Sequence, residues 1–313
     1  MIVVFGSINI DLVARVTRIA APGETVLAPC YAAIPGGKGA NQALAARRAG
    51  AQVRLVGAVG RDSFADAALA LLRADAVDLD GVATVDVATG IAFIAVDAQG
   101  ENAITVAAGA NALARASQIG PMRAGDILLL QREVPDAQGM EAALVANRAG
   151  ARVILNLAPA GHVTEQYLGL VDVLIMNEHE ALALGAQYRM KGAGVDEVAA
   201  MLDREMEMSA IVTLGAAGAM AWHRGRHLAF AAPKIGVIDT TGAGDAFAGA
   251  FAAALAADSK GSASSSRDFH GRFHDAMVFA IAAGSLACTK AGAQPSLPSA
   301  SAIAALASGG TAF

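Results

Sequence analysis

The chain has 313 residues, of which 55% are hydrophobic and 16% charged, and its net charge is −5. A chain this rich in apolar residues can form a sizeable core, which excludes a disordered protein. The length suits one large α/β domain with a smaller appendage. The acidic balance, with no block of lysine or arginine, argues against nucleic acid as the main partner.

Residues 2–5 form a β-branched and aromatic run that ends at Gly6, which indicates a buried parallel strand. Beyond it, Asn9 and Asp11 alternate with apolar residues, so both side chains project to one side if the strand continues. Two polar groups at the carboxyl end of a strand fit a hydroxyl-rich ligand. From this stretch alone, a simple turn explains them equally well.

Several extended segments carry no helical period, namely residues 12–16, 25–34, 82–87, 91–96 and 103–107. The first two come too early in the chain to be crossover helices. The last two flank the turn Asp97-Ala98-Gln99-Gly100 and form a hairpin pattern. We therefore expect residues 11–35 and 82–107 to form a small β-sheet lid on a main domain of residues 1–10, 36–81 and 108–313.

The segment Gly36-Gly37-Lys38-Gly39-Ala40-Asn41-Gln42 opens a helix that is predicted to end near Ala49. Its glycines allow the backbone to approach a ligand closely, and Lys38 and Asn41 bracket the start of the helix. The spacing of a phosphate-binding P-loop is absent. An ordinary glycine-rich loop remains the alternative here.

From residue 126 onward, strand and helix patterns alternate regularly. The strands are predicted at 127–130, 153–157, 171–176 and 211–214, and the helices at 136–149 and 195–208. This repetition predicts a doubly wound, mostly parallel sheet flanked by helices. Polar residues follow three of the strands, where sites of α/β proteins gather; they are Gln131 with Glu133, Asn156, and Asn177 with Glu180.

Asn177 and Glu180 permit two interpretations. Asn177 is a good helix N-cap with Glu180 three positions on, which is the pattern of a capping box. The pair could also supply oxygens to hydrated Mg²⁺ near the phosphates of ATP. The turn Thr213-Leu214-Gly215-Ala216-Ala217-Gly218 is similarly open, either to nucleotide or to a simple entry into the strand 219–223.

The stretch Asp239-Thr240-Thr241-Gly242-Ala243-Gly244-Asp245 precedes an uncharged, proline-free run predicted to be a buried helix. Backbone N–H groups at a helix start bind anions, aided by the helix dipole. A carboxylate there suits a base that takes a proton from an attacking hydroxyl while the N–H groups hold developing phosphoryl charge. The alternative is a glycine-rich turn whose aspartate caps the helix.

Residues 258–275 are rich in serine and glycine and are expected to form a mobile surface loop between two helices. All six histidines are expected at the surface. Two pairs, His223 with His227 and His270 with His274, are four residues apart, a spacing that suits a metal only on a helix. Neither pair is expected to be helical.

Two further features concern location. Cys30 and Cys288 stand far apart and form neither a disulfide framework nor a zinc pattern. No basic residue precedes Arg15, unlike in a signal peptide, and the longest uncharged runs are too short to span a bilayer. We therefore expect a cytoplasmic protein with no membrane partner.

Taken together, the motifs resemble those of the ribokinase (PfkB) family of carbohydrate kinases. The resemblance runs nearly end to end, and the order of the motifs is more specific than any one of them. The matching segments are Gly6-Ser7-Ile8-Asn9-Ile10-Asp11, Gly36 to Gln42, Gly100-Glu101-Asn102, Ala108-Gly109-Ala110-Asn111, Leu130-Gln131-Arg132-Glu133, Asn156-Leu157-Ala158-Pro159-Ala160, Asn177 with Glu180, Thr213-Leu214-Gly215, Asp239 to Asp245 and Gly292-Ala293-Gln294-Pro295-Ser296.

The resemblance implies an αβα domain with a β lid that often forms a homodimer interface, and transfer of the ATP γ-phosphoryl group to the 5-hydroxyl of ribose. It implies sugar contacts from Asn9, Asp11, Gly37, Lys38, Asn41 and Glu133. It implies nucleotide contacts from Asn177, Thr213, Gly215, Gly218 and Gly244, with Glu180 in the Mg²⁺ water network. The anion hole would be Gly242, Ala243 and Gly244, and the base Asp245. A K⁺ loop would comprise Asp239, Thr241, Ala287, Lys290, Gly292 and Ser296, most of them through backbone carbonyls.

Two departures from the family pattern stand out. Ile281 occupies a position in the adenine pocket where many relatives have a polar residue, and the segment 258–275 is longer than expected beside the nucleotide site.

Other functions are also compatible with parts of the sequence. The first strand lacks the glycine fingerprint of a dinucleotide oxidoreductase. A kinase for another furanose or for a nucleoside such as adenosine, or an inactive sugar-binding sensor, stays open.

Overall fold

The computed structural model describes residues 1–190, 192–257 and 269–309. In this part of the chain nine strands form one large sheet in the order β13-β12-β11-β10-β9-β8-β1-β4-β5. These strands are β1 (Ile2–Phe5), β4 (Val53–Gly60), β5 (Asp78–Val85), β8 (Ile127–Leu130), β9 (Arg152–Asn156), β10 (Val173–Asn177), β11 (Ser209–Thr213), β12 (Ala219–His223) and β13 (Arg226–Phe230). All neighbours from β5 to β11 are parallel, and β12 and β13 continue the sheet antiparallel. This confirms the expected fold class.

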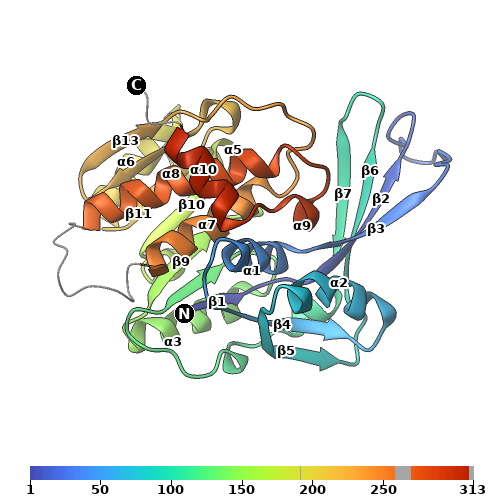
Figure 1. The fold of residues 1–313 in the computed structure, drawn as a ribbon, viewed down its shortest axis with the longest axis horizontal. Helices are drawn as coiled ribbons and strands as arrows, with labels where there is room; N and C mark the ends of the chain where they lie inside the picture. Colours follow the sequence, from blue (N-terminus) through green and yellow to red (C-terminus); the bar gives the residue numbers. More distant parts are fainter. Residues whose placement is uncertain (191, 258–268, 310–313) are drawn as a thin grey trace.

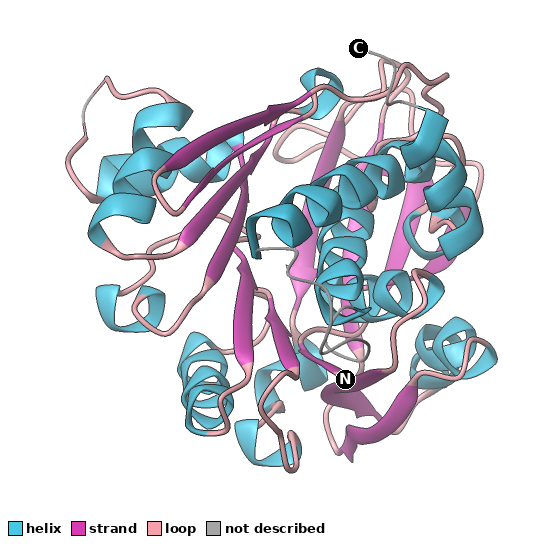
Figure 2. Ribbon diagram, turned by 60° about the vertical axis from the view of Figure 1, so that its left-hand side comes forward, coloured by secondary structure: helices cyan, strands magenta, loops and turns pink. Residues whose placement is uncertain are grey.

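Helices cover both faces of this sheet because its parallel strands are apolar on both sides. In β1, Ile2 and Val4 pack into one core, and Val3 and Phe5 pack into the other. The first face carries α1 (Lys38–Arg48), α2 (Ser63–Ala74), α7 (Ala243–Ala257) and α8 (Phe269–Ala287). The second carries α3 (Asp136–Arg148), α4 (Glu165–Leu168), α5 (Glu178–Gln187) and α6 (Val195–Glu205). Figure 2 shows the strands between these helical layers.

Shorter elements complete the main domain. Ile303 of α10 (Ala300–Gly309) packs against Ala282 and Ala283 of α8. The small helix α9 (Ala293–Ser296) precedes it, and 3₁₀ turns occur at η1 (Gly109–Leu113), η2 (Ala116–Gln118) and η3 (Gly215–Ala217). No helix among the described residues is long and apolar enough to cross a membrane.

A second sheet projects from the main body (Figure 1). In the described chain it has four strands in the order β3-β2-β6-β7, which are β2 (Asn9–Arg15), β3 (Tyr31–Gly36), β6 (Gly90–Val96) and β7 (Asn102–Ala107). We call this sheet the lid. β6 and β7 pair antiparallel, which confirms the predicted hairpin.

The lid joins the main sheet at β1, the third strand from the β5 side of the sheet. Only three residues separate the end of β1 from the start of β2, and Gly37 alone separates β3 from α1. Asn9 pairs with Gly36 at the near end of the lid. β1 itself lies between β4 and β8, where the strand order reverses, and such a switch point is where α/β folds form ligand crevices.

Three expectations need correction. Residues 82–85 lie in β5, which pairs with β4 in the main sheet, so the segment 82–87 does not begin the lid. β3 begins only at Tyr31, so residues 25–30 of the extended segment expected at 25–34 lie outside the strand. The expected loop 258–275 ends earlier, because α8 begins at Phe269; residues 258–268 lie outside the described chain. The pair His270 and His274 therefore falls on a helix.

Candidate active site

A cavity of about 220 Å³ lies at the carboxyl ends of β9, β10 and β11. These strand ends supply Asn156, Asn177 and Thr213, while α1 and α7 bring Lys38 and Asp245 to the same space. Most of the polar residues that follow the predicted strands therefore meet here, as the parallel sheet requires. The complete polar lining is Lys38, Asn156, Asn177, Glu180, Thr213 and Asp245.

Asp245 lies in the first turn of α7 and is only 8% exposed. Its Oδ2 accepts a hydrogen bond from Asn41 Nδ2 at 2.9 Å, and its Oδ1 accepts one from Gln42 Nε2 at 2.8 Å. Burial raises the pKa of Asp245 above its ordinary value, although the positive charge of Lys38 and the two amide donors act in the opposite direction. A buried carboxylate with increased proton affinity is suited to act as a general base.

The turn before Asp245 borders the cavity through Gly242 and Gly244. Gly242 has a φ of 79°, in the left-handed region that favours glycine. The N–H of Ala243 donates to the Thr240 carbonyl at 3.2 Å and so closes the turn. In this structure, therefore, the Ala243 N–H serves the turn, while the two glycines face the space at the start of α7.

Asp11 and Glu133 lie on the lid side of Asp245. Burial is the main cause that raises the pKa of Asp11 to about 7, and the charges of Glu133 and Asp245 contribute to this rise against the effect of Lys38. Burial lowers the pKa of Lys38, yet the four nearby carboxylates outweigh it and hold that pKa above its ordinary value. Lys38 therefore remains charged among the carboxylates of Asp11, Glu133, Glu180 and Asp245.

Hydrogen bonds fix several of the predicted sugar contacts in place. Glu133 Oε2 accepts from Ser7 Oγ at 2.6 Å and from the Lys38 N–H at 3.1 Å. Asn111 Nδ2 donates to Asn9 Oδ1 at 2.7 Å. Within the described chain, the buried Asn41 Oδ1 has no hydrogen-bond partner, so it remains available to a ligand hydroxyl.

Two glycines make this arrangement possible. A Cβ on Gly36 would lie 2.3 Å from the Asp11 carboxylate, so any larger residue would displace Asp11. Gly37 has a φ of 87°, and a Cβ there would lie 2.8 Å from the Asn9 N atom. The glycine-rich segment is therefore required by close backbone approach to β2, beyond its role in starting α1.

A second, more apolar cavity of about 450 Å³ adjoins the first and shares Thr213 and Gly244 with it. Gly215 and Gly218 lie on one side of it, and Ile281 lies on the α8 side. Its size and apolar lining suit a nucleobase, and Ile281 offers that base an apolar contact. The position of Ile281 agrees with the expectation of an adenine pocket without a polar contact there.

Asn177 and Glu180 form the predicted capping box. The Glu180 N–H donates to Asn177 Oδ1 and the Asn177 N–H donates to Glu180 Oε2, both at 2.8 Å. Glu180 also lines the smaller cavity, and burial raises its pKa. The structural and functional interpretations are compatible, because the cap uses one carboxylate oxygen and the other can bind water around Mg²⁺.

Asp239 ties together the two segments of the predicted K⁺ loop. Its oxygens accept the N–H of Thr241 at 2.9 Å and the N–H of Gly292 at 2.8 Å. Burial acts to raise its pKa, but these hydrogen bonds outweigh it, so the pKa is lowered and the charge retained. The Ile238 N–H donates to the Cys288 carbonyl at 2.8 Å, which brings the chain beside Ala287 and Lys290 to this loop.

Ser296 is buried, and its hydroxyl donates to the Ala293 carbonyl at 2.8 Å. Among the described residues, no three His, Cys, Asp or Glu side chains gather as a metal cluster. One carboxylate with hydroxyl and carbonyl oxygens is nevertheless a donor set that fits a hard cation such as K⁺. The residues present thus fit the expected ion, with Asp239 as the charged member.

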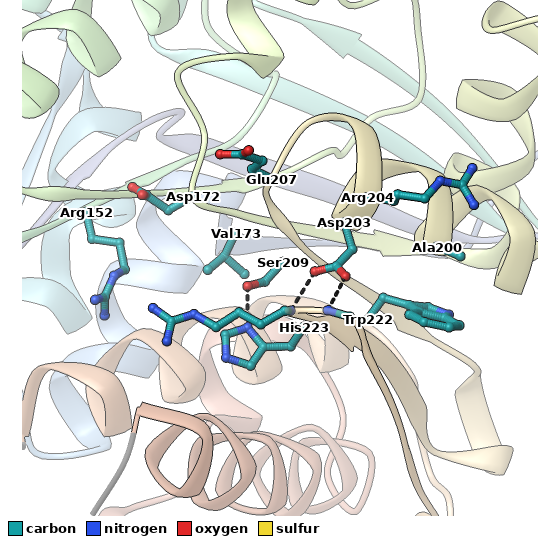
Figure 3. A pocket seen from close by; sticks show the side chains of 12 residues that line it. Arg152, Asp172, Val173, Ala200, Asp203, Arg204, Glu207, Ser209, Trp222 and His223 are labelled. Atoms are coloured by element: carbon teal, nitrogen blue, oxygen red, sulfur yellow. Dashed lines mark hydrogen bonds between the residues drawn. The ribbon is translucent and has the colours of Figure 1, made fainter. Parts of the chain in front are cut away.

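A larger cavity, of about 690 Å³, lies at the amino ends of the same three strands, and Figure 3 shows the side chains that line it. Arg152, Asp172 and Ser209 stand there at the amino ends of β9, β10 and β11. His223 is buried at these ends and stacks on Phe273 with ring centroids 4.2 Å apart, so the expectation that all six histidines lie at the surface is wrong for it. This cavity contains none of the predicted site residues.

Three buried amides of the site and Ser7 have no role that was predicted from the sequence. The amides are Gln42, Gln131 and Asn156, which hydrogen-bond to one another. The signal was present, because each lies inside a motif of the resemblance. Their contacts join residues up to 114 positions apart, however, and these depend on the completed fold.

Comparison with known proteins agrees with this geometry. A family model described as pfkB family carbohydrate kinase matches residues 1–300. A ribokinase of Haemophilus influenzae is 36% identical over 303 residues, which are 94% of both chains. The crystal structure of a Thermotoga maritima ribokinase is 33% identical, covers 97% of this chain and 98% of its own, and superposes with a TM-score of 0.85.

An Arabidopsis thaliana ribokinase, whose structure was solved in complex with ribose and ATP, is 29% identical. The match covers 98% of each chain with a TM-score of 0.82. The similarity to these proteins spans both the main domain and the lid. Sequence and structure therefore agree that this chain belongs to the pfkB family of carbohydrate kinases.

Proposed function

We propose that this chain transfers the γ-phosphoryl group of ATP to the 5-hydroxyl of D-ribose, giving ribose 5-phosphate. The observation that carries the proposal is the place of Asp245. It is buried at the start of α7, between the sugar-side carboxylates and the apolar cavity that suits a nucleobase. The ribokinases that resemble this chain over nearly its full length support the choice of sugar.

In the proposed reaction Asp245 takes the proton from the 5-hydroxyl as that oxygen attacks the γ-phosphorus, and the bond from this phosphorus to the bridging oxygen of ATP breaks to release ADP. Gly242 and Gly244 place backbone N–H groups at the helix start, where they would stabilise charge on the transferred group. Lys38 adds a positive charge beside the same cavity. Positioning and electrostatics supply most of the catalysis in this class of reaction.

The proposed sugar contacts are Asn9, Asp11, Gly37, Lys38, Asn41 and Glu133. The ionised Asp11 can accept two hydrogen bonds, which suits a pair of neighbouring hydroxyls. The unpartnered Asn41 Oδ1 supplies another acceptor within the described site. A site that satisfies several hydroxyls in this way favours a free sugar over an apolar substrate.

For ATP we propose contacts from Asn177, Thr213, Gly215, Gly218 and Gly244. Mg²⁺ would be held through water by Glu180, and would neutralise phosphate charge when bound. K⁺ would be held by the loop of Asp239, Thr241, Ala287, Lys290, Gly292 and Ser296. We further propose that the chain acts in the cytoplasm as a homodimer joined through the lid.

Exposed apolar side chains on the lid support the proposed dimer. Tyr31 and Phe93, on one face of the lid, are 71% and 50% exposed, and Ile104 and Val106, on its other face, are 54% and 48% exposed. Exposed apolar surface of this kind can mark a protein–protein interface. Sedimentation of the wild-type chain would test it, with Ile104→Lys as the disruptive variant. A wild-type chain that sediments as a monomer at all concentrations would contradict the proposed dimer.

The proposed activity is tested with ATP and a panel of pentoses, hexoses and nucleosides, followed by ADP release. We expect D-ribose to have the highest kcat/KM. We expect 2-deoxyribose to lose at least about tenfold in kcat/KM, because one buried hydrogen-bond partner is left unpaired. A higher kcat/KM for adenosine than for ribose would contradict ribose as the substrate but would not contradict the kinase assignment.

A further inference from the structure

Gln42 contacts the proposed base from inside the protein. It lies in α1 and is 0% exposed, so it is not in a position to touch a substrate. Its Nε2 donates to Asp245 Oδ1 at 2.8 Å and to Asn156 Oδ1 at 2.9 Å. Its Oε1 accepts from Gln131 Nε2 at 2.7 Å. All of its polar atoms are therefore engaged in a buried network that ends on the Asp245 carboxylate.

The chemistry of the partners fixes which way the Gln42 amide points. An ionised carboxylate only accepts hydrogen bonds, so the NH₂ group has to face Asp245. Gln131 donates to the Oε1 on the other side of the amide, which reinforces the same orientation. Asn156 accepts the second hydrogen of the NH₂ group and in turn donates to the Ile175 carbonyl at 3.3 Å. The direction of the network is thus anchored to a backbone group of β10.

The two donors to Asp245 differ in their exposure to the sugar. Asn41 has an unpartnered Oδ1 in the described structure and is among the proposed sugar contacts, so its amide is expected to adjust when a sugar binds. Gln42 has no such second task. It is the donor that stays in place through the reaction, and a buried hydrogen bond to a charged group is about twice as strong as a neutral one.

We propose that Gln42 is a positioning residue that fixes the orientation of the Asp245 carboxylate and favours its ionised form, with Gln131 and Asn156 holding Gln42 in place. The inference rests on the proposed function of Asp245 as the base. Gln42 acts only through Asp245, so its loss should change the step that needs the base and leave substrate binding nearly intact. A purely structural glutamine would instead change stability alone.

The test replaces Gln42 with methionine, which keeps the length of the side chain and removes the amide. We expect kcat to fall about tenfold, as for a small misplacement of a catalytic group, with KM for ATP and ribose nearly unchanged. Removing a donor to the ionised form raises the Asp245 pKa, so the acid limb of the kcat profile should move up by about one pH unit. Gln131→Met should give a smaller shift in the same direction.

Gln118→Met is the matched control. Gln118 Nε2 donates to the carbonyls of Gly57 and Gly81 and its Oε1 accepts the Arg115 N–H, so this variant loses three hydrogen bonds, as Gln42→Met does, but none to Asp245. We expect it to lower the melting temperature and leave the acid limb in place. Thermal unfolding of all variants separates loss of fold from loss of positioning.

A turnover-independent readout separates this inference from the proposed function. Infrared titration of the carboxyl band that disappears in Asp245→Asn gives the pKa of Asp245 without any substrate. An upward shift of this pKa in Gln42→Met supports the inference even if ribose proves to be the wrong sugar. An unchanged pKa together with an unchanged acid limb overturns it, while the activity of wild-type enzyme on the sugar panel judges the proposed function by itself.

Discussion

The strands β9, β10 and β11 have a cavity at each end, and the two cavities differ in what their polar groups do. At the amino ends the polar groups serve the fold. Asp203 accepts the N–H groups of Arg224 and Gly225, at 2.7 and 2.6 Å, and Ser209 shares a 2.7 Å hydrogen bond with His223. At the carboxyl ends the polar groups converge on Asp245 and leave Asn41 Oδ1 without a partner in the described chain.

The difference shows that the size of a cavity does not identify an active site. The larger cavity is the one whose described acids, such as Asp172 and Asp203, hydrogen-bond to nearby backbone N–H groups. The smaller one concentrates buried carboxylates around one lysine, and helices α1, α5 and α7 begin beside it. Helix N-termini favour negative charge, so the carboxyl ends of these strands are the ends suited to bind phosphate.

The largest expected difference between the two cavities comes from replacing the proposed base. We expect Asp245→Asn to lower kcat by about 10²-fold or more, because proton transfer from the attacking hydroxyl loses its acceptor. The fold should be retained, since asparagine keeps the size of the side chain. Steady-state kinetics with circular dichroism as the folding check measures this. A variant that keeps most of its kcat rules out Asp245 as the base.

The next effect concerns Asp11 and pH. In the proposed sugar site both oxygens of Asp11 can accept hydrogen bonds only when the group is ionised, and its pKa of about 7 places that change near neutral pH. We therefore expect kcat/KM for ribose to rise as the pH increases through about 7, with KM for ATP much less affected. Asp11→Ala should raise KM for ribose strongly and abolish this rise.

Asp11→Asn serves as the control for size, because it keeps the side-chain shape without the titration. Its kcat/KM for ribose should be low and should not change across the same pH range. If Asp11→Ala binds ribose as well as wild type does, then the sugar does not contact this strand.

A smaller effect is expected from the cation. K⁺ should activate more than Na⁺, because an ion held at Asp239 would order the turn that contains Gly242 and Gly244. The rates are to be compared in KCl, NaCl and a bulky organic chloride at equal ionic strength. Asp239→Asn should remove the difference. Equal rates in all three salts for the wild-type chain contradict the proposed ion site.

The smallest expected effect is at the cavity beside the amino ends of β9, β10 and β11. Asp203→Ala removes the acceptor of two backbone N–H groups in the turn between β12 and β13. We expect a loss of about 1 kcal/mol in the free energy of unfolding, discounted because the site is half exposed. The kcat should not change. Urea unfolding and kinetics on one preparation measure both, and a clear fall in kcat would connect this cavity to catalysis.

Local pattern was sufficient for much of this fold. β8 and β12 begin and end where the apolar runs do, and Asn177 caps α5 as its spacing predicts. Strand membership was harder, because β5 and the lid strands have similar patterns. Only pairing decides between them, and β5 pairs with β4 of the main sheet. The start of α8 was missed because serine and glycine before it obscure its helical period.

Some residues of the candidate site could likewise be predicted from the sequence, and others could not. Residues at strand ends, such as Asn156 and Asn177, could be placed near one another because parallel strands share an edge. The network through Gln42 could not, because it depends on how α1 packs against β8, β9 and α7. His223 shows the same limit, since its burial depends on Phe273 from a helix 50 residues further on.

Because the connections between the lid and the main sheet are short, a small rotation at the base of the lid produces a larger displacement at its far end. β2 has seven residues and so extends roughly 20 Å from Asn9, at the ordinary rise of a strand. A rotation of a few degrees where Asn9 pairs with Gly36 would thus move the far end of the lid by more than an ångström. Cys30, an exposed free thiol directly before β3, lies at that far end. A fluorophore attached to Cys30 would convert small adjustments at the sugar site into an optical signal.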